Sequence, residues 1–158
     1  MIKTWACILT TVILTAFDQL TKYFAVLHLK ETSGVPLISG VFELYYLENT
    51  GAAWGLFGGM KWLFLILTAL ISALIMYSWI KIPNTAKYTA FRILSSILAA
   101  GAIGNALDRV FRGFVVDFFY FSLIDFPVFN VADCFVCVSL ILILIIYRNE
   151  DFSWMKKS

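Results

Sequence analysis

Long apolar runs alternate with short polar stretches along this chain of 158 residues. The apolar runs cover residues 4–27, 62–80, 88–107 and 131–147. A helix of about 20 apolar residues crosses the hydrocarbon core of a bilayer. The pattern therefore predicts an all-α membrane protein with four transmembrane helices, in a single membrane domain that spans residues 1–158.

Residues 29–60 have a different pattern. The turn-forming residues Gly34, Pro36 and Gly40 precede or interrupt a run of aromatic and β-branched residues that continues to Leu47. Residues of these types favour strands. We therefore expect a small β element at about residues 31–56, outside the bilayer. A simple loop is the alternative for the small residues at 48–55.

The composition agrees with the membrane class. The chain is 61% hydrophobic and 14% charged, whereas soluble domains are about 25% charged. The formal net charge of +2 is too small to favour nucleic-acid binding. All three cysteines lie in apolar runs, which argues against an extracellular disulfide framework.

Basic residues are unevenly distributed between the two ends of the predicted helices. Loops on the cytoplasmic side of a membrane carry an excess of Lys and Arg. The end that holds both termini carries Lys3, Lys81, Lys87, Arg148, Lys156 and Lys157. We therefore expect a multi-pass protein with both termini in the cytoplasm, and residues 29–60 and 108–130 near the extracytoplasmic face.

Four of the ten acidic residues gather between the third and fourth apolar runs: Asp108, Asp117, Asp125 and Asp133. An ionised carboxylate at membrane depth is costly unless it is paired, hydrated or functional. Two carboxyl groups that share one proton can perform acid–base hydrolysis. The chain has one histidine, His28, and no G-x-S-x-G motif, which argues against zinc and serine hydrolases.

Several polar residues also have simple structural explanations. Asp18 and Lys22 can form an ion pair at the membrane interface, and Asp108 can pair with Arg112 one helical turn later. Asp133 or Asn130 can cap the fourth helix. Asp117 has no charged neighbour in the sequence. A proton-coupled transporter or a noncatalytic membrane assembly protein would also contain such acids or small residues.

Five short motifs occur in order: Asp18-Gln-Leu-Thr-Lys22, Asn49-Thr-Gly-Ala-Ala53, Gly104-Asn-Ala-Leu-Asp-Arg109, Val115-Val-Asp-Phe118 and Phe129-Asn-Val-Ala-Asp133. With these motifs, nearly the whole chain resembles the bacterial lipoprotein signal peptidases, or signal peptidase II. The resemblance implies a metal-free and cofactor-free aspartyl endopeptidase of the bacterial cytoplasmic (inner or plasma) membrane. Its substrates would be diacylated prolipoproteins, cut on the amino side of the lipidated cysteine.

The resemblance also assigns residues. It implies that Asp117 and Asp133 are the catalytic pair. It implies that an amphipathic or helical segment at about residues 111–126 lies over the site, and that membrane lipid, but no nucleic acid or obligate protein partner, contacts the enzyme. The residues implied in substrate binding and support are Asp18, Lys22, Asn49, Gly51, Gly104, Asn105, Asp108, Arg109, Asn130 and Ala132.

The chain departs from the family pattern at a few positions. Cys134 stands where Ser usually follows the second catalytic Asp, and Trp54 stands where Phe is common. Ala106 is smaller than the residue expected there. A thiol is a poorer hydrogen-bond donor than a hydroxyl, so local hydrogen bonding beside Asp133 is the property that these departures affect most.

Overall fold

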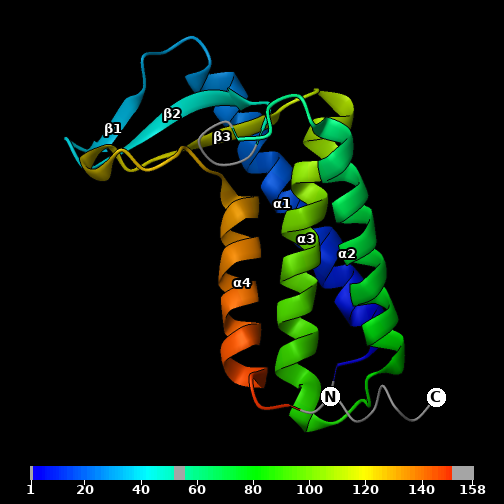
Figure 1. The fold of residues 1–158 in the computed structure, drawn as a ribbon. Coiled ribbons are helices and arrows are strands. Elements are labelled where there is room, and N and C mark those ends of the chain that lie inside the picture. The colour runs from blue at the N-terminus through cyan, green and yellow to red at the C-terminus, as the bar shows by residue number, and fades with distance from the viewer. Residues whose placement is uncertain (1, 52–55, 151–158) are drawn as a thin grey trace.

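The computed structural model describes residues 2–51 and 56–150, which form a helical bundle with a small sheet at one end (Figure 1). The described helices are α1 (Thr4–Leu29), α2 (Lys61–Lys81), α3 (Thr89–Phe111) and α4 (Val131–Tyr147). The described strands are β1 (Val35–Ile38), β2 (Phe42–Asn49) and β3 (Val115–Tyr120). The described 3-10 helices are η2 (Ala86–Tyr88) and η3 (Ser122–Ile124). The predicted class, apolar helices with a small β element, is confirmed.

Three of the helical segments are long and apolar enough to cross a membrane: Thr4–Leu29, Lys61–Lys81 and Ala86–Phe111. Helix α4 has 17 residues, and this length is at the lower end of the range for a spanning helix. Helix α3 packs against α1, α2 and α4. The large apolar side chains on the outside of the bundle, such as Trp62 and Leu74, are exposed, as expected where lipid is the solvent.

Small residues on α3 allow the close packing of α3 against α4. A Cβ atom at Gly101 would collide with the carbonyl oxygen of Ala132 and with the side chain of Val136. Small residues at helix contacts are typical of membrane bundles, because they let backbones approach closely. The start of α4 is therefore held against the second half of α3.

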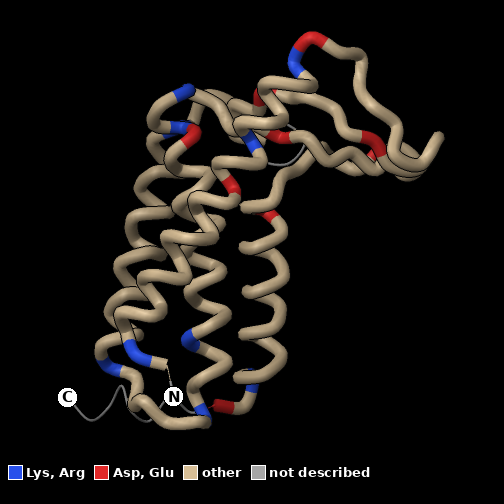
Figure 2. Tube along the Cα trace, turned by 180° about the vertical axis from the view of Figure 1, so that it is seen from behind, with Lys and Arg blue, Asp and Glu red and all other residues tan. Residues whose placement is uncertain are grey.

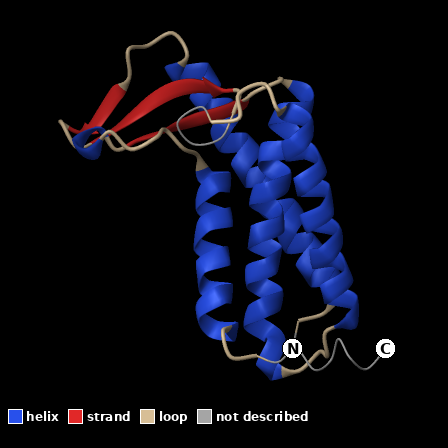
Figure 3. Ribbon diagram, viewed as in Figure 1, coloured by secondary structure: helices blue, strands red, loops and turns tan. Residues whose placement is uncertain are grey.

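The sheet is antiparallel in the order β1-β2-β3 and projects sideways from one end of the bundle (Figure 3). Its inner part packs on the end of α1 through Ala25, Leu29, Val116 and Phe118. Side chains alternate between the two faces of a strand. Asp117, between Val116 and Phe118, therefore points away from this apolar cluster.

The expectation for residues 111–126 was wrong in its secondary structure. Residues Val115–Tyr120 form strand β3, and the helical residues of this segment are Phe111, where α3 ends, and the three residues Ser122–Ile124. The β-branched and aromatic residues of Val115–Tyr120 favour a strand, and β2 offers a free edge, where Leu47 pairs with Asp117. The third strand of the β element therefore comes from a segment more than 60 residues away in sequence. Asn49 on β2 and Asp117 on β3, for example, are 68 residues apart.

Strand β3 is tied directly to the start of α4. The backbone N–H groups of Phe119 and Phe129 each donate to the other residue's carbonyl, at 2.8 and 3.0 Å. Residues 129–131 then lead into the helix. This connection brings the strand that carries Asp117 next to the helix that carries Asp133.

Candidate active site

Asp117 lies in the middle of β3 and is almost completely buried. Its two carboxylate oxygens each accept a hydrogen bond from an asparagine amide. Asn130 Nδ2 donates to Oδ1 at 2.6 Å, and Asn49 Nδ2 donates to Oδ2 at 2.8 Å. Asp117, which has no charged neighbour in the sequence, is therefore held by two amide groups from other elements. These are Asn49 of β2 and Asn130, the N-cap of α4.

Asp133 lies in the first turn of α4. The Asn130 side chain accepts from the Asp133 backbone N–H at 3.0 Å, and the Asp133 carboxylate accepts from the Asn130 backbone N–H at 3.0 Å. This reciprocal pair is a capping box. The other carboxylate oxygen accepts from Asn105 Nδ2 on α3 at 2.7 Å. The capping prediction for Asn130 is confirmed, and Asn130 contacts both aspartates.

The three asparagine amides are each fixed in one orientation by their neighbours. Asn130 Oδ1 accepts from a backbone N–H, while its Nδ2 group faces Asn105 Oδ1 and the Asp117 carboxylate. Asn105 Oδ1 accepts from Lys22, and Asn49 Oδ1 accepts from the Gly51 N–H. A flip of any of these amides would turn an oxygen toward a carboxylate, so the network has one consistent arrangement.

A buried cluster of charged side chains lies next to this hydrogen-bond network and contacts it through Asn105. Lys22 Nζ lies 3.0 Å from Asp18, 3.3 Å from Asp108 and 2.8 Å from Asn105 Oδ1. The side chains of Lys22, Asp18 and Asp108 are all 0% exposed. The predicted Asp18–Lys22 ion pair exists, and both of its side chains are fully buried inside the bundle. Burial is possible because each charge has a partner of opposite sign.

Asp108 links the cluster to the sheet. Its carboxylate accepts from the Val116 backbone N–H at 3.0 Å and pairs with Arg112 at 3.3 Å, so the predicted pairing with Arg112 is also present. Val116 precedes Asp117. The position of Asp117 is therefore coupled to α3 through the backbone of its neighbour.

Asp18 links the same cluster to α4. Its carboxylate accepts from the backbone N–H of Ala132 at 3.0 Å and from Gln19 at 3.1 Å. Gly104 leaves the space for this contact, since a Cβ atom there would collide with Asp18 Oδ2. An acidic side chain of α1 thus satisfies a free N–H in the first turn of α4, where anions are favoured.

Arg109, near the end of α3, borders the other side of the site. Its guanidinium donates to the Gly51 carbonyl at 2.9 Å and to the Asn105 carbonyl at 3.3 Å. It also lies over the ring of Phe64, 4.4 Å from the centroid, in a cation–π contact. Ala52 and Ala53, of the motif that contains Gly51, and Trp54, which follows that motif, lie outside the described residues.

The pKa of Asp117 is raised to about 7, mainly because burial penalises its charged form and also because of the negative charge of Asp133. The hydrogen bonds from Asn49 and Asn130 oppose this shift. The direction is the one required of an acid that keeps its proton near neutral pH. The two carboxyl groups thus have Asn130 as a common hydrogen-bonding partner, and burial favours the protonated form of Asp117.

The structure brings all twelve predicted site residues into one connected region. Sequence reasoning missed two contributors: Gln19, which bridges Asp18 and the Gly104 carbonyl, and Phe64, whose ring contacts the Arg109 guanidinium. Gln19 lies in the motif Asp18-Gln-Leu-Thr-Lys22. A polar residue within an apolar helix is a signal that could have identified Gln19 as part of the site. In residues 2–51 and 56–150, no group of three or more His, Cys, Asp or Glu side chains is arranged to hold a metal ion.

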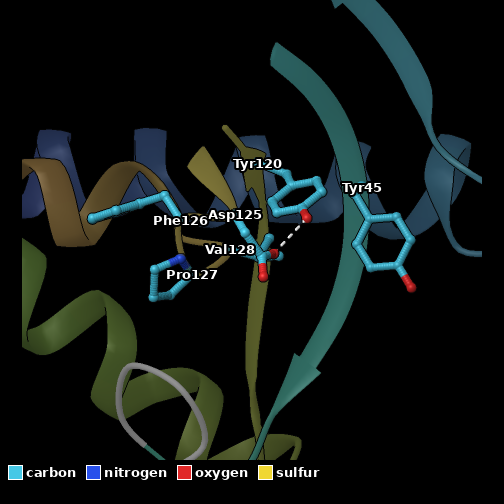
Figure 4. A pocket seen from close by; sticks show the side chains of 6 residues that line it. All are labelled: Tyr45, Tyr120, Asp125, Phe126, Pro127 and Val128. Atoms are coloured by element: carbon cyan, nitrogen blue, oxygen red, sulfur yellow. Dashed lines mark hydrogen bonds between the residues drawn. The ribbon is translucent and has the colours of Figure 1, made fainter. Parts of the chain in front are cut away.

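Asp125, the fourth acid of the cluster in the sequence, lies apart from this site. It accepts a hydrogen bond from the Tyr120 hydroxyl at 2.7 Å, and it lines a pocket of about 320 Å³ (Figure 4). The pocket contains none of the predicted site residues; its lining is Tyr45, Tyr120, Asp125, Phe126, Pro127 and Val128. Asp125 therefore serves as a matched control for the two buried acids.

Comparison with solved structures defines the class of protein. The fold is similar to two chains described as bacterial membrane enzymes. The first has a TM-score of 0.81 at 34% identity and covers 93% of this chain and 90% of the other. The second has a TM-score of 0.76 at 36% identity and covers 92% and 93%. The chain therefore has the fold of a membrane enzyme.

The sequence comparisons give the family. The family model described as signal peptidase (SPase) II matches residues 10–148. A lipoprotein signal peptidase of Clostridioides difficile is 42% identical over 87% of this chain and 91% of its own length. One from Streptococcus pyogenes is 33% identical over 92% and 95%. The chain belongs to the signal peptidase II family, and it is therefore a bacterial membrane peptidase.

Proposed function

We propose that this peptidase removes signal peptides from diacylated prolipoproteins, cutting on the amino side of the lipidated cysteine, with Asp117 and Asp133 as the catalytic pair. The observation that carries the proposal is the position of Asn130, which contacts both carboxylates. The substrate class follows from the names of the relatives, lipoprotein signal peptidases.

The chemistry follows from the different surroundings of the two acids. Asp117, with its raised pKa of about 7, keeps a proton and donates it to the oxygen of the scissile carbonyl. Asp133 accepts a proton from a water molecule, whose oxygen attacks the carbonyl carbon. When the tetrahedral intermediate collapses, the C–N bond breaks, Asp133 gives its proton to the leaving nitrogen, and Asp117 recovers its own.

The supporting residues have defined roles in this proposal. Asn49, Asn105 and Asn130 hold the carboxylates in place by the hydrogen bonds described above. Arg109 and Gly51 border the entry side, where the guanidinium can bind the peptide backbone of the substrate. Lys22, Asp18, Asp108, Gly104 and Ala132 fix the relative positions of α1, α3 and α4. General acid–base catalysis of this kind contributes about 10²–10⁴-fold to the rate.

We also propose how the chain lies in the membrane. It forms one domain with four spans, and the end of the bundle where α1 begins and α4 ends faces the cytoplasm. The supporting observation is in the sequence, where Lys3, Lys81, Lys87, Arg148, Lys156 and Lys157 flank the spans at that end, and the positive-inside rule places such an end in the cytoplasm. Figure 2 shows basic residues at both ends of the helices and most of the acidic residues at the sheet end. The site then lies near the extracytoplasmic face, where acyl chains of the substrate remain in lipid and only its peptide reaches the aspartates.

A cleavage assay in detergent tests the proposal. Purified enzyme is given a prolipoprotein already diacylated on its cysteine, beside the same protein without the lipid, and cleavage is followed by gel shift. We expect cleavage of the lipidated substrate only, in the presence of chelators as well as in their absence. Asp117→Asn and Asp133→Asn should each abolish cleavage, whereas Asp125→Asn should retain it.

The variants must be folded for this comparison to be valid, which thermal unfolding in the same detergent measures. Substantial cleavage by a folded Asp117→Asn or Asp133→Asn enzyme would rule out the catalytic pair. Equal cleavage of the unlipidated protein would rule out recognition of the lipidated cysteine and leave the pair intact. Mass spectrometry of the new amino terminus determines the cleaved bond.

A further inference from the structure

Arg109 is a cation near both aspartates of the site, yet it forms no ion pair in the described part of the chain. The negative charge of Asp133 acts on its guanidinium most strongly, followed by those of Asp117 and Asp108. The ion pairs of the described residues nevertheless do not include Arg109, whereas Arg112, three residues later, pairs with Asp108 at 3.3 Å. A long side chain of opposite charge is attracted to such carboxylates. Other contacts must therefore hold the Arg109 guanidinium in place.

Two carbonyl groups and one aromatic ring provide these contacts. The guanidinium donates to the Gly51 carbonyl at 2.9 Å and to the Asn105 carbonyl at 3.3 Å. Both carbonyls accept at the edge of the guanidinium, because its N–H groups lie in its plane. The guanidinium also lies over the ring of Phe64, 4.4 Å from the centroid, well inside the limit of about 6 Å for a cation–π contact. The ring thus adds a restraint that uses no N–H group.

Phe64 connects α2 to the site. The start of α2 lies beside the end of α3, at the sheet end of the bundle (Figure 1). At the opposite end of α2, Trp79 is joined to α3 by hydrogen bonds with Ser95 and Arg92. At the sheet end, α2 contacts the site through the ring of Phe64. The other cation–π contacts of the described residues are made by lysines, at 5.2 to 5.9 Å, so the contact with Arg109 is the shortest of this group.

We infer that Phe64 is a positioning residue of this peptidase, whose ring holds the Arg109 guanidinium away from the Asp133 carboxylate. The inference rests on the proposed function, in which Asp133 accepts a proton from water and Arg109 binds the substrate backbone. An ion pair between Arg109 and Asp133 would occupy both groups, because it would weaken the carboxylate as a base and engage the N–H donors. The ring stabilises the cation without donating or accepting a proton, so both groups remain available.

The competing role for Phe64 is packing alone. Its side chain is partly buried, and a phenylalanine at this position also fills space between α2 and α3. The two roles depend on different properties of the ring. Packing depends on its shape, whereas a cation–π contact depends on the negative charge of its face. Fluorine atoms on the ring withdraw that charge and change the shape little, so they separate the two roles.

A series of fluorinated phenylalanines at position 64 tests the inference. Phenylalanines with one, two or three fluorine atoms are introduced there by stop-codon suppression, and kcat/KM is measured on the diacylated prolipoprotein. The matched control is the same series at Phe17, which is exposed on α1 and takes part in none of the cation–π contacts of the described residues. We expect kcat/KM to fall stepwise at position 64, by about three- to tenfold with three fluorine atoms, and to stay constant at position 17. Phe64→Tyr should retain the wild-type rate.

A kcat/KM that is independent of fluorination at position 64 would assign Phe64 to packing and overturn the inference, as would an equal decline at position 17. The ¹⁹F resonance of a singly fluorinated residue 64 measures the contact without cleavage, and we expect it to shift in Arg109→Gln. An unchanged resonance would overturn the inference whether or not substrate is cleaved. A shifted resonance in an enzyme that cleaves no prolipoprotein would support the contact and refute the proposed function instead.

Discussion

The carboxylate of Asp18, on the first helix, accepts a hydrogen bond at 3.0 Å from the backbone N–H of Ala132, on the last. Ala132 directly precedes Asp133. The same carboxylate is paired with Lys22 at 3.0 Å. Asp18 therefore connects the first helix to the last and fixes the position of the helix that carries Asp133.

We expect Asp18→Ala to destabilise the protein strongly. It removes the hydrogen bond to Ala132 and leaves Lys22 with fewer compensating charges, and breaking a buried ion pair costs about 3–5 kcal/mol. Thermal unfolding in detergent measures the loss, with Glu31→Ala, an exposed acid beyond the same helix, as the control. An unfolding temperature of Asp18→Ala equal to that of Glu31→Ala would contradict this role.

The rate of cleavage should depend on pH through Asp117. Because its pKa is about 7, the carboxyl group loses its proton as the pH rises through that value. In the proposed mechanism the proton is required, so kcat/KM should fall by about tenfold per pH unit above pH 7. Rates measured from pH 5 to pH 9, roughly two units either side of that pKa, test the assignment. A rate that rises throughout this range would assign the acid role to another group.

The stability of the fold should also depend on pH through the same residue. The pKa of Asp117 is raised from 3.8 in the unfolded chain to about 7 in the fold. Between these values the folded state binds more protons, so the contribution of Asp117 to stability decreases as the pH rises. Asp117→Asn removes this contribution. Unfolding temperatures at several pH values should fall less steeply for Asp117→Asn than for the wild type; identical slopes would contradict the burial argument.

Arg109→Lys tests whether the shape of the guanidinium matters. Lysine keeps the charge but cannot reach both the Gly51 and Asn105 carbonyls in the same planar geometry. A hydrogen bond from a charged group contributes about 1.5–3 kcal/mol, so kcat/KM should fall roughly 10- to 100-fold. Arg112→Lys is the control, because lysine can retain the ion pair with Asp108. Similar small effects in both variants would limit Arg109 to a charge role.

The helices were predictable because hydrophobicity and length decide whether a segment crosses a bilayer, and both can be read directly from the sequence. The capping box of α4 was predictable for a similar reason, since Asn130 and Asp133 are three residues apart. Local pairs such as Asp18 with Lys22 and Asp108 with Arg112 follow from helical spacing. In each case the partners lie within one turn of each other.

The contacts between distant segments were not predictable from spacing. The sequence of Val115–Tyr120 favours a strand, but only the free edge of β2 decides that it forms one. The burial of Lys22 depends on Asp108 and Asn105 of another helix, and the amide of Asn49 reaches Asp117 only through the register of the sheet. The motifs named the residues of the site, but the hydrogen bonds between them required the structure.

The contact between Asp18 and Ala132 spans 114 residues of chain, and this has a consequence for biosynthesis. The first helix leaves the translocon long before the last is made, with an acid and a lysine on its apolar surface. Because Asp18 and Lys22 are one helical turn apart, their charges can neutralise each other before the last helix is present. In the proposed mechanism, the pair of Asp117 and Asp133 is therefore complete only when the final helix, which carries Asp133, is in place.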